Sequence, residues 1–112
     1  MKRGEIWLVN LDPTIGAEIR KTRPAIIVSN DEIGILPLRV IVPITDWKPH
    51  YSAAKWMVKL EPDLDNNLSK PSSADCFQVR SVSKERLIKK LGNIVPLQMI
   101  QIDEALQIAL GI

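Results

Sequence analysis

The chain has 112 residues, 46% of them apolar and 25% charged, which is enough for one compact domain spanning residues 1–112. Its net charge of +2 is too small for bulk attraction to a polyanion, so any such ligand must bind at a local basic group. One cysteine, Cys76, excludes an internal disulfide and a thiolate metal cage. The apolar runs are far shorter than the roughly 20 residues of a membrane-spanning helix, and no signal-peptide block opens the chain. We therefore expect a cytoplasmic protein with no membrane segment, whose small core favours dimerisation.

The first half of the chain carries three β-rich segments separated by turn residues. Residues 5–11 predict a strand that ends at Asp12-Pro13. Residues 14–23 lack apolar periodicity and hold three of the fifteen basic residues, which predicts a long loop suited to an anion. Residues 25–28 and 38–45 predict two further strands, the second near a sheet edge or a bulge because it contains Pro43.

The second half adds strands and ends in a helix. Residues 56–60 predict a strand, and the period-2 rhythm of residues 73–82 predicts another. Ser83 is a possible helix cap, but residues 87–94 fit a helix or a strand, and propensity does not decide between them. Between Pro96 and Gly111 an apolar stripe recurs at helical spacing, formed by Leu97, Ile100, Ala105, Leu106 and Ala109. The order predicts a mainly β (α+β) fold, a small barrel of about six or seven strands with a C-terminal amphipathic helix.

Several chemistries have little support in this sequence. His50 is the only histidine, and the acids at positions 61, 63 and 65 share a turn with Pro62, which is typical of a solvated turn. No glycine-rich phosphate loop is present. We expect no metal and no cofactor, and we interpret Cys76 as a small core residue.

What remains is a set of basic, amide and hydroxyl side chains at strand ends. An arginine offers a planar fork of donors, and neutral polar groups add hydrogen bonds to phosphate oxygens or base edges. Taken singly, Arg23 is more often a solvated or salt-bridged loop arginine, and Thr45 is more often a strand-end hydroxyl. The members of the set are Arg23, Ser29, Asn30, Thr45, Gln78 and Arg80.

Ordered motifs across almost the whole chain resemble the MazF/PemK toxin family of type II toxin-antitoxin systems. The motifs are RGEIWLV (3–9), LDPTIGAE (11–18), TRPAIIVSN (22–30), VPIT (42–45), QVRSVSKERL (78–87) and DEALQIALG (103–111). The resemblance implies a homodimeric small barrel, similar in fold to CcdB, that cleaves single-stranded RNA without a metal. It also implies 2′,3′-cyclic phosphate and 5′-OH ends, inhibition of growth, and neutralisation by a cognate MazE-like antitoxin.

Residue by residue, the resemblance places the catalytic pair at Arg23 and Thr45. It places RNA contacts at Glu18, Asn30 and Gln78, and it gives Arg80 a phosphate-binding or structural role. The physical argument agrees for the pair, because a fixed guanidinium and a hydroxyl can stabilise the charge of a phosphorane.

The chain departs from the family pattern at two positions. Ala17 stands where some members have a histidine, and Phe77 stands where some have an acid, so a general base is missing. Asp75, predicted on the same strand face as Phe77, and Glu18 are the candidate substitutes. The missing acid also keeps open an alternative, a toxin that acts on gyrase or another protein without cutting RNA, as CcdB does.

The resemblance bears on two further points. It favours a short helical turn after Ser83, followed by a strand at residues 87–94. The three tryptophans are candidate stacking surfaces for bases, although core packing is the better interpretation for Trp7.

Overall fold

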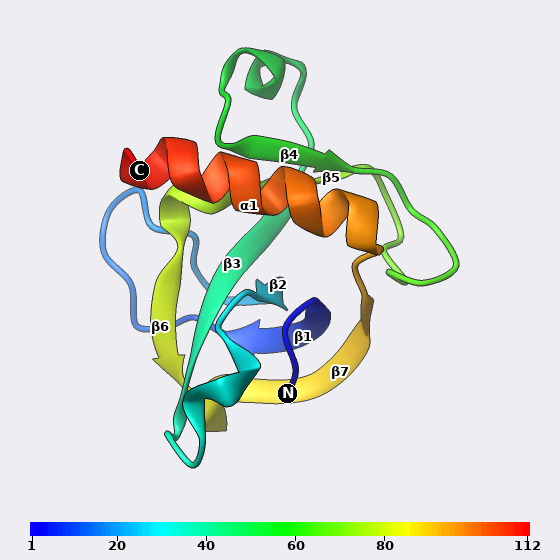
Figure 1. The fold of residues 1–112 in the computed structure, drawn as a ribbon. Coiled ribbons are helices and arrows are strands. Elements are labelled where there is room, and N and C mark those ends of the chain that lie inside the picture. The colour runs from blue at the N-terminus through cyan, green and yellow to red at the C-terminus, as the bar shows by residue number, and fades with distance from the viewer.

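The computed structural model describes residues 1–112 as a curled antiparallel sheet covered by one helix (Figure 1). The strand order is β4-β5-β3-β2-β1-β7, and β6 pairs with β3. No pairing joins β6 to β7, so the sheet does not close into a complete barrel. The fold class predicted from the sequence is confirmed. The elements are β1 (Glu5–Asn10), β2 (Thr22–Ile27), β3 (Leu38–Asp46), β4 (Met57–Leu60), β5 (Ser72–Asp75), β6 (Arg80–Ser83), β7 (Leu87–Asn93) and α1 (Pro96–Leu110).

Strand β3 is the longest strand and changes partner along one edge at Pro43. β6 pairs with it as far as Ile41, and β5 pairs with it from Ile44. On the other edge, Val28 donates its N–H to the Val40 carbonyl, so the backbone of Val40 faces β2. Successive residues of an antiparallel strand direct their backbone N–H and C=O groups to alternate sides. The nitrogen of Pro43, three residues after Val40, therefore faces away from β2. The missing N–H of proline therefore falls in the local gap between β6 and β5, although β3 itself pairs on both sides and is not the predicted edge strand.

Two apolar clusters lie on the two faces of the sheet. Strand β2 alternates between them, since Ile26 belongs to a cluster of 12 buried residues and Ile27 to a cluster of 7. Helix α1 closes the larger cluster with Met99, Ile102 and Ala105. Burial of this alternating set is the main stabilisation of the sheet.

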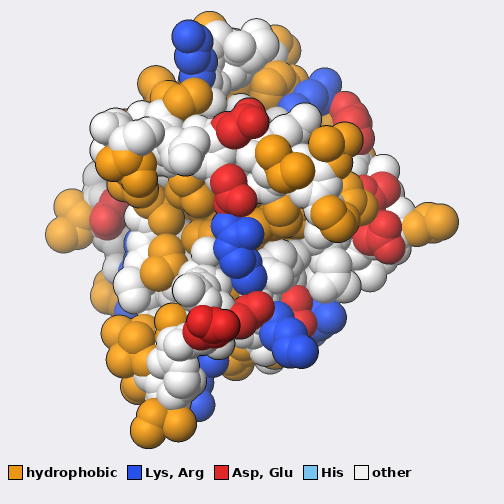
Figure 2. All heavy atoms as spheres, in the orientation of Figure 1, with side chains coloured by type: hydrophobic (Ala, Val, Ile, Leu, Met, Phe, Trp, Pro, Cys, Tyr) orange, Lys and Arg blue, Asp and Glu red, His pale blue; other side chains and the backbone are white.

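The helix runs over the predicted residues, and its predicted buried face is right in part, since Ala105 is buried and Leu106 packs against the larger cluster. The expected stripe included Leu97 and Ile100, which are 69% and 55% exposed. Pro96 opens the helix and Gly111 ends it in the left-handed conformation. Figure 2 shows apolar side chains exposed on the face that carries α1. No helix of the molecule is long and apolar enough to cross a membrane.

The predicted strand over residues 73–82 is wrong in its centre. The chain leaves β5 at Asp75, forms a 3-10 turn, η3 (Cys76–Gln78), and only then enters β6. Asp75 causes the break, because its side chain accepts the Phe77 N–H at 3.2 Å and caps the turn.

The ambiguity after Ser83 is resolved as a short turn followed by a strand. Ser83 caps the 3-10 turn η4 (Lys84–Arg86) by accepting the Glu85 N–H, and β7 then pairs with β1. At the start of the chain, Trp7 is half-buried against the smaller cluster and donates its indole N–H to Glu5, so core packing is confirmed.

Candidate functional site

The two predicted catalytic residues line one pocket of about 270 Å³. Strand β2 begins at Thr22, so Arg23 belongs to the strand and not to the predicted loop. Ala25 is paired with Pro43, and the same register continued by two positions sets Arg23 opposite Thr45. The sheet thus brings together a guanidinium and a hydroxyl that are 22 residues apart in the sequence. We call this the Arg23 pocket.

The Arg23 guanidinium has no acidic partner. Its only hydrogen bond runs from Nε to the Arg20 carbonyl, at 3.4 Å, and none of the ion pairs of the molecule includes it. Its terminal nitrogens retain their donors for a ligand. An arginine without a counter-ion beside strand-end hydroxyls is an arrangement suited to a phosphate.

The far wall of the Arg23 pocket comes from residues that sequence reasoning missed. The connection between β4 and β5 supplies most of it, including Lys70, whose Nζ lies 3.1 Å from the Asp46 carboxylate. Asp46 is the only carboxylate that lines this pocket. For Asp46, the sequence offered one signal of a place in this pocket, namely its position directly after Thr45. Nothing in the sequence pattern links residues 67–70 to β2. The further lining residues are Asn67, Leu68, Ser69, Ser72 and Leu91.

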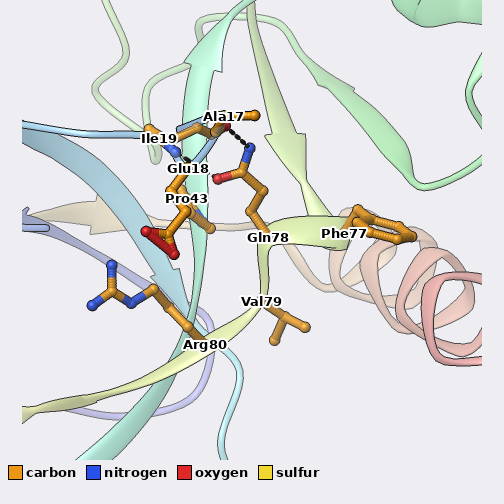
Figure 3. A pocket seen from close by; sticks show the side chains of 8 residues that line it. All are labelled: Ala17, Glu18, Ile19, Pro43, Phe77, Gln78, Val79 and Arg80. Carbon is orange, nitrogen blue, oxygen red and sulfur yellow. Dashed lines mark hydrogen bonds between the residues drawn. The ribbon is translucent and has the colours of Figure 1, made fainter. Parts of the chain in front are cut away.

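A second pocket, of about 470 Å³, lies beside the connection between β1 and β2, and we call it the loop pocket. It contains three predicted RNA-binding residues, Glu18, Gln78 and Arg80 (Figure 3). Pro43 also lines it, whereas the next two residues of β3 line the Arg23 pocket. The two pockets are therefore neighbours along β3.

Gln78 joins the β1–β2 loop (residues 11–21) to the turn η3. Its Oε1 accepts the Ile19 N–H at 2.6 Å, and its Nε2 donates to the Ala17 carbonyl at 3.1 Å. Figure 3 shows the amide turned toward the loop. Glu18 is held in the same loop, where its Oε1 accepts the Ile15 N–H at 2.6 Å. Gln78 thus fixes one wall of the loop pocket.

The base of the same loop is fixed by arginines. Arg80 donates to the Leu11 carbonyl at 3.2 Å, and Arg86 donates to the carbonyls of Asn10 and Asp12. Arg80 keeps a structural contact while it lines the loop pocket, which is consistent with either of its predicted roles.

Two of the predicted site residues lie apart from these pockets. Asn30 follows β2 at the end opposite Arg23, and its side chain caps the turn η1 (Asp31–Ile33) by accepting the Glu32 N–H at 2.9 Å. Asp75 lines neither pocket. The expectation that it shares a strand face with Phe77 is wrong, because Asp75 is 7% exposed and Phe77 63% exposed. Burial raises the pKa of Asp75, and this effect outweighs the hydrogen bonds from the backbone of Phe77 and Gln78, which act to lower the pKa.

Cys76 is completely buried in the larger apolar cluster, as predicted for a core residue. Burial, together with the nearby carboxylates of Asp75 and Asp103, raises the pKa of its thiol to about 12. A thiol in this environment is protonated at neutral pH and is a poor nucleophile.

The sequence of the whole domain identifies the class of protein to which this fold and these pockets belong. Residues 2–110 match the family model described as PemK-like, MazF-like toxin of type II toxin-antitoxin system, and the chain belongs to this family.

Relatives that match over the whole chain include two named endoribonucleases. Endoribonuclease MazF9 of Mycobacterium tuberculosis is 33% identical over 118 residues, which cover 100% of this chain and 98% of the relative. Endoribonuclease EndoA of Bacillus subtilis is 30% identical over 115 residues, which cover 100% of this chain and 96% of the relative.

Solved structures show the same fold. MazF of Deinococcus radiodurans aligns with a TM-score of 0.83 at 22% identity, over 100% of this chain and 97% of that chain. A mycobacterial endoribonuclease in complex with its cognate antitoxin aligns with a TM-score of 0.78 at 23% identity, over 98% of this chain and 94% of that chain.

Proposed function

We propose that this chain is an endoribonuclease toxin that cleaves single-stranded RNA sequence-selectively and without a metal, and so inhibits translation and growth. The observation that carries the proposal is the Arg23 pocket, where a guanidinium without a counter-ion lies across the sheet from a threonine hydroxyl. Membership of the toxin family and the endoribonuclease activity named for its relatives support it.

The proposed reaction takes its nucleophile from the substrate. The ribose 2′-OH attacks the adjacent phosphorus, the bond from phosphorus to the 5′-oxygen breaks, and the proton lost by the 2′-oxygen is balanced by one gained at the 5′-oxygen. Arg23 and Thr45 stabilise the negative charge that grows on the phosphorane. The products carry a 2′,3′-cyclic phosphate and a 5′-OH. Of the two candidate bases, Glu18 lines the neighbouring pocket and Asp75 lines neither, so Glu18 is the better placed to accept the proton, in addition to its predicted contact with the RNA.

Selectivity for RNA sequence belongs to the loop pocket in this proposal. Gln78, Glu18 and Arg80 offer amide, carboxylate and guanidinium groups at its surface. Single-stranded RNA is read through hydrogen bonds to the edges of splayed bases, which these groups provide. Asn30, at the far end of β2, keeps its predicted RNA contact at a separate place on the molecule.

The proposal includes a homodimer and a cognate antitoxin. The exposed apolar side chains of α1, among them Leu97 and Ile100, offer surface that pairing of two copies would cover. A disordered acidic segment of an antitoxin fits the unpaired cation of the Arg23 pocket and would block RNA there. The structure of a mycobacterial relative in complex with its cognate antitoxin supports this part.

The test is cleavage of a mixed-sequence RNA by the purified protein in excess EDTA, followed by mapping of both ends. We expect cutting at a short sequence motif, with 5′ ends that a polynucleotide kinase can label without prior dephosphorylation. Arg23→Ala should lower the rate about 10²–10³-fold, the typical cost of one donor to a transition-state anion. The matched control is Arg39→Ala, because Arg39 bonds only the carbonyls of Leu36 and Leu38.

Three outcomes would contradict this proposal. Cleavage abolished by EDTA would exclude the metal-free reaction. An unchanged rate in Arg23→Ala would remove Arg23 from the chemistry. Intact RNA under every condition, together with capture of gyrase, would favour the alternative of a toxin that acts on a protein.

A further inference from the structure

We infer that the aromatic pair Phe77 and Trp56 is a stacking platform for one base of the RNA, at the end of the loop pocket away from the β1–β2 loop. The inference rests on the proposed function and deepens it, since it names two side chains that would hold one base of the RNA. The predicted RNA contacts do not include Phe77, and Trp56 was predicted only as one of three tryptophans on which a base could stack.

The exposure of Phe77 is the first observation. This ring is 63% exposed although it follows the fully buried Cys76, and Trp56 beside it is 36% exposed. The ring centroids are 5.5 Å apart, and the planes are tilted by 55°. Trp56 thus supports Phe77 from one side and leaves ring surface open to a ligand.

The platform is held rigidly by the backbone on which it stands. The Asp75 carboxylate accepts the Phe77 N–H at 3.2 Å, and the Trp56 carbonyl accepts the Cys76 N–H at 3.1 Å. Cys76 is buried in the larger apolar cluster, with its sulfur 4.0 Å from the Ile102 carbonyl. The turn that carries Phe77 is therefore anchored by the core, so stacking of a base costs little conformational entropy.

The chemistry of the loop pocket changes from one end to the other. Figure 3 shows the Gln78 amide turned toward the loop and the Phe77 ring pointing away from it. Arg80 and Glu18 lie at the polar part of the same pocket. Each of these groups suits one feature of a nucleotide. The aromatic ring suits the face of the base, the hydrogen-bonding groups suit the polar edge of the base, and the guanidinium suits the phosphate.

Charge favours a nucleic acid over an apolar peptide as the occupant. Lys55, directly before Trp56, makes no ion pair, and Arg80 donates only to the Leu11 carbonyl. An RNA strand brings a phosphate to each of these cations together with the base for the ring.

The test uses RNA that the protein cannot cut, so that binding is measured apart from cleavage. A random pool of single-stranded 2′-fluoro oligonucleotides lacks the attacking 2′-OH, and 5-iodouridine in place of uridine cross-links to a stacked aromatic ring on irradiation. We expect a cross-link to the peptide that contains Phe77 or to the one that contains Trp56. We also expect Phe77→Leu to weaken binding of the pool about 5-fold to 100-fold, the usual range for loss of one stacked base.

Phe77→Tyr is the matched control, because it keeps the ring and should keep the affinity. Cross-links confined to other peptides, or equal affinities of the leucine and tyrosine variants, would overturn the platform while RNA binding stood. Failure of the unchanged protein to bind the pool would overturn the platform together with the proposed function. Phe77 is exposed, so equal thermal melting of the variants should establish that the fold is intact.

Discussion

Replacing Gln78 with leucine should release the β1–β2 loop from the rest of the domain. The change removes two hydrogen bonds, one from the Ile19 N–H to Oε1 at 2.6 Å and one from Nε2 to the Ala17 carbonyl at 3.1 Å. A typical hydrogen bond contributes about 1 kcal/mol net, so the free energy of opening the loop should fall by about 2 kcal/mol. Since 1.4 kcal/mol is tenfold, the open state should be populated about 30 times more often.

The assay is amide hydrogen exchange at Ile19, whose N–H loses its acceptor in Gln78→Leu. Gln78→Glu separates the two bonds, because a carboxylate still accepts the Ile19 N–H but offers no donor to Ala17. We expect the Ile19 amide to exchange about 30 times faster in the leucine variant and by a smaller factor in the glutamate variant. Gln101→Leu, on the exposed side of α1, is the control for loss of a glutamine elsewhere. Unchanged exchange at Ile19 in Gln78→Leu would refute the assignment of Gln78 as the anchor of the loop.

Two further substitutions test stability in the neighbouring strands β7 and β1. Gly92→Ala would place a Cβ atom 2.4 Å from the Asp65 carbonyl oxygen, a backbone atom, so we expect a loss of about 1–3 kcal/mol in urea unfolding, the usual cost of overpacking. A free energy of unfolding equal to that of the unchanged chain would show that the backbone of the β4–β5 connection can move to accommodate the added Cβ atom. Burial raises the pKa of Glu5, but the indole N–H of Trp7 and other donors outweigh it and hold the pKa at about 2, below the ordinary value of 4.5. A lowered pKa stabilises the fold above about pH 4.5, and this contribution is lost as the pH falls toward 2. Glu5→Gln should therefore be about 1–2 kcal/mol less stable in urea at pH 7, after allowance for solvent screening, and the difference should shrink as the pH falls toward 2. A difference that stays constant with pH would contradict the lowered pKa.

Sequence patterns predicted the elements that follow a single local rule. The apolar block at residues 25–28 predicted the second half of strand β2, and the stretch from Pro96 to Gly111 predicted helix α1, because the apolar pattern and the terminal residues agree there. The break inside residues 73–82 was missed, because the period-2 pattern continues through a turn that one capping carboxylate, Asp75, creates. The helix face was predicted only in part, with Ala105 buried but Leu97 and Ile100 exposed, because apolar residues occur all round α1 and only packing decides which of them are buried.

Only part of the candidate site was predictable, because its residues come from strands and a connection that are far apart in the sequence. Arg23 and Thr45 were named through a resemblance, and the register of β2 with β3 supplies the physical ground for it, because their positions face each other across one pair of strands. Lys70 and the rest of the far wall come from the β4–β5 connection, and no periodicity encodes that long-range contact. Local pattern therefore revealed neither wall of the pocket. The resemblance supplied Arg23 and Thr45, and nothing supplied the residues of the β4–β5 connection.

The break in pairing at Pro43 explains why the two pockets lie where they do. β3 loses β6 as a partner after Ile41 and gains β5 at Ile44, so one strand edge is left without a neighbour between them. The turn η3 crosses this gap and carries Phe77 and Gln78 to the loop pocket, on one side of which Pro43 lies. The following residues of β3 line the Arg23 pocket. A proline that cannot donate to a neighbouring strand thus places the proposed base-reading residues beside the proposed catalytic pair.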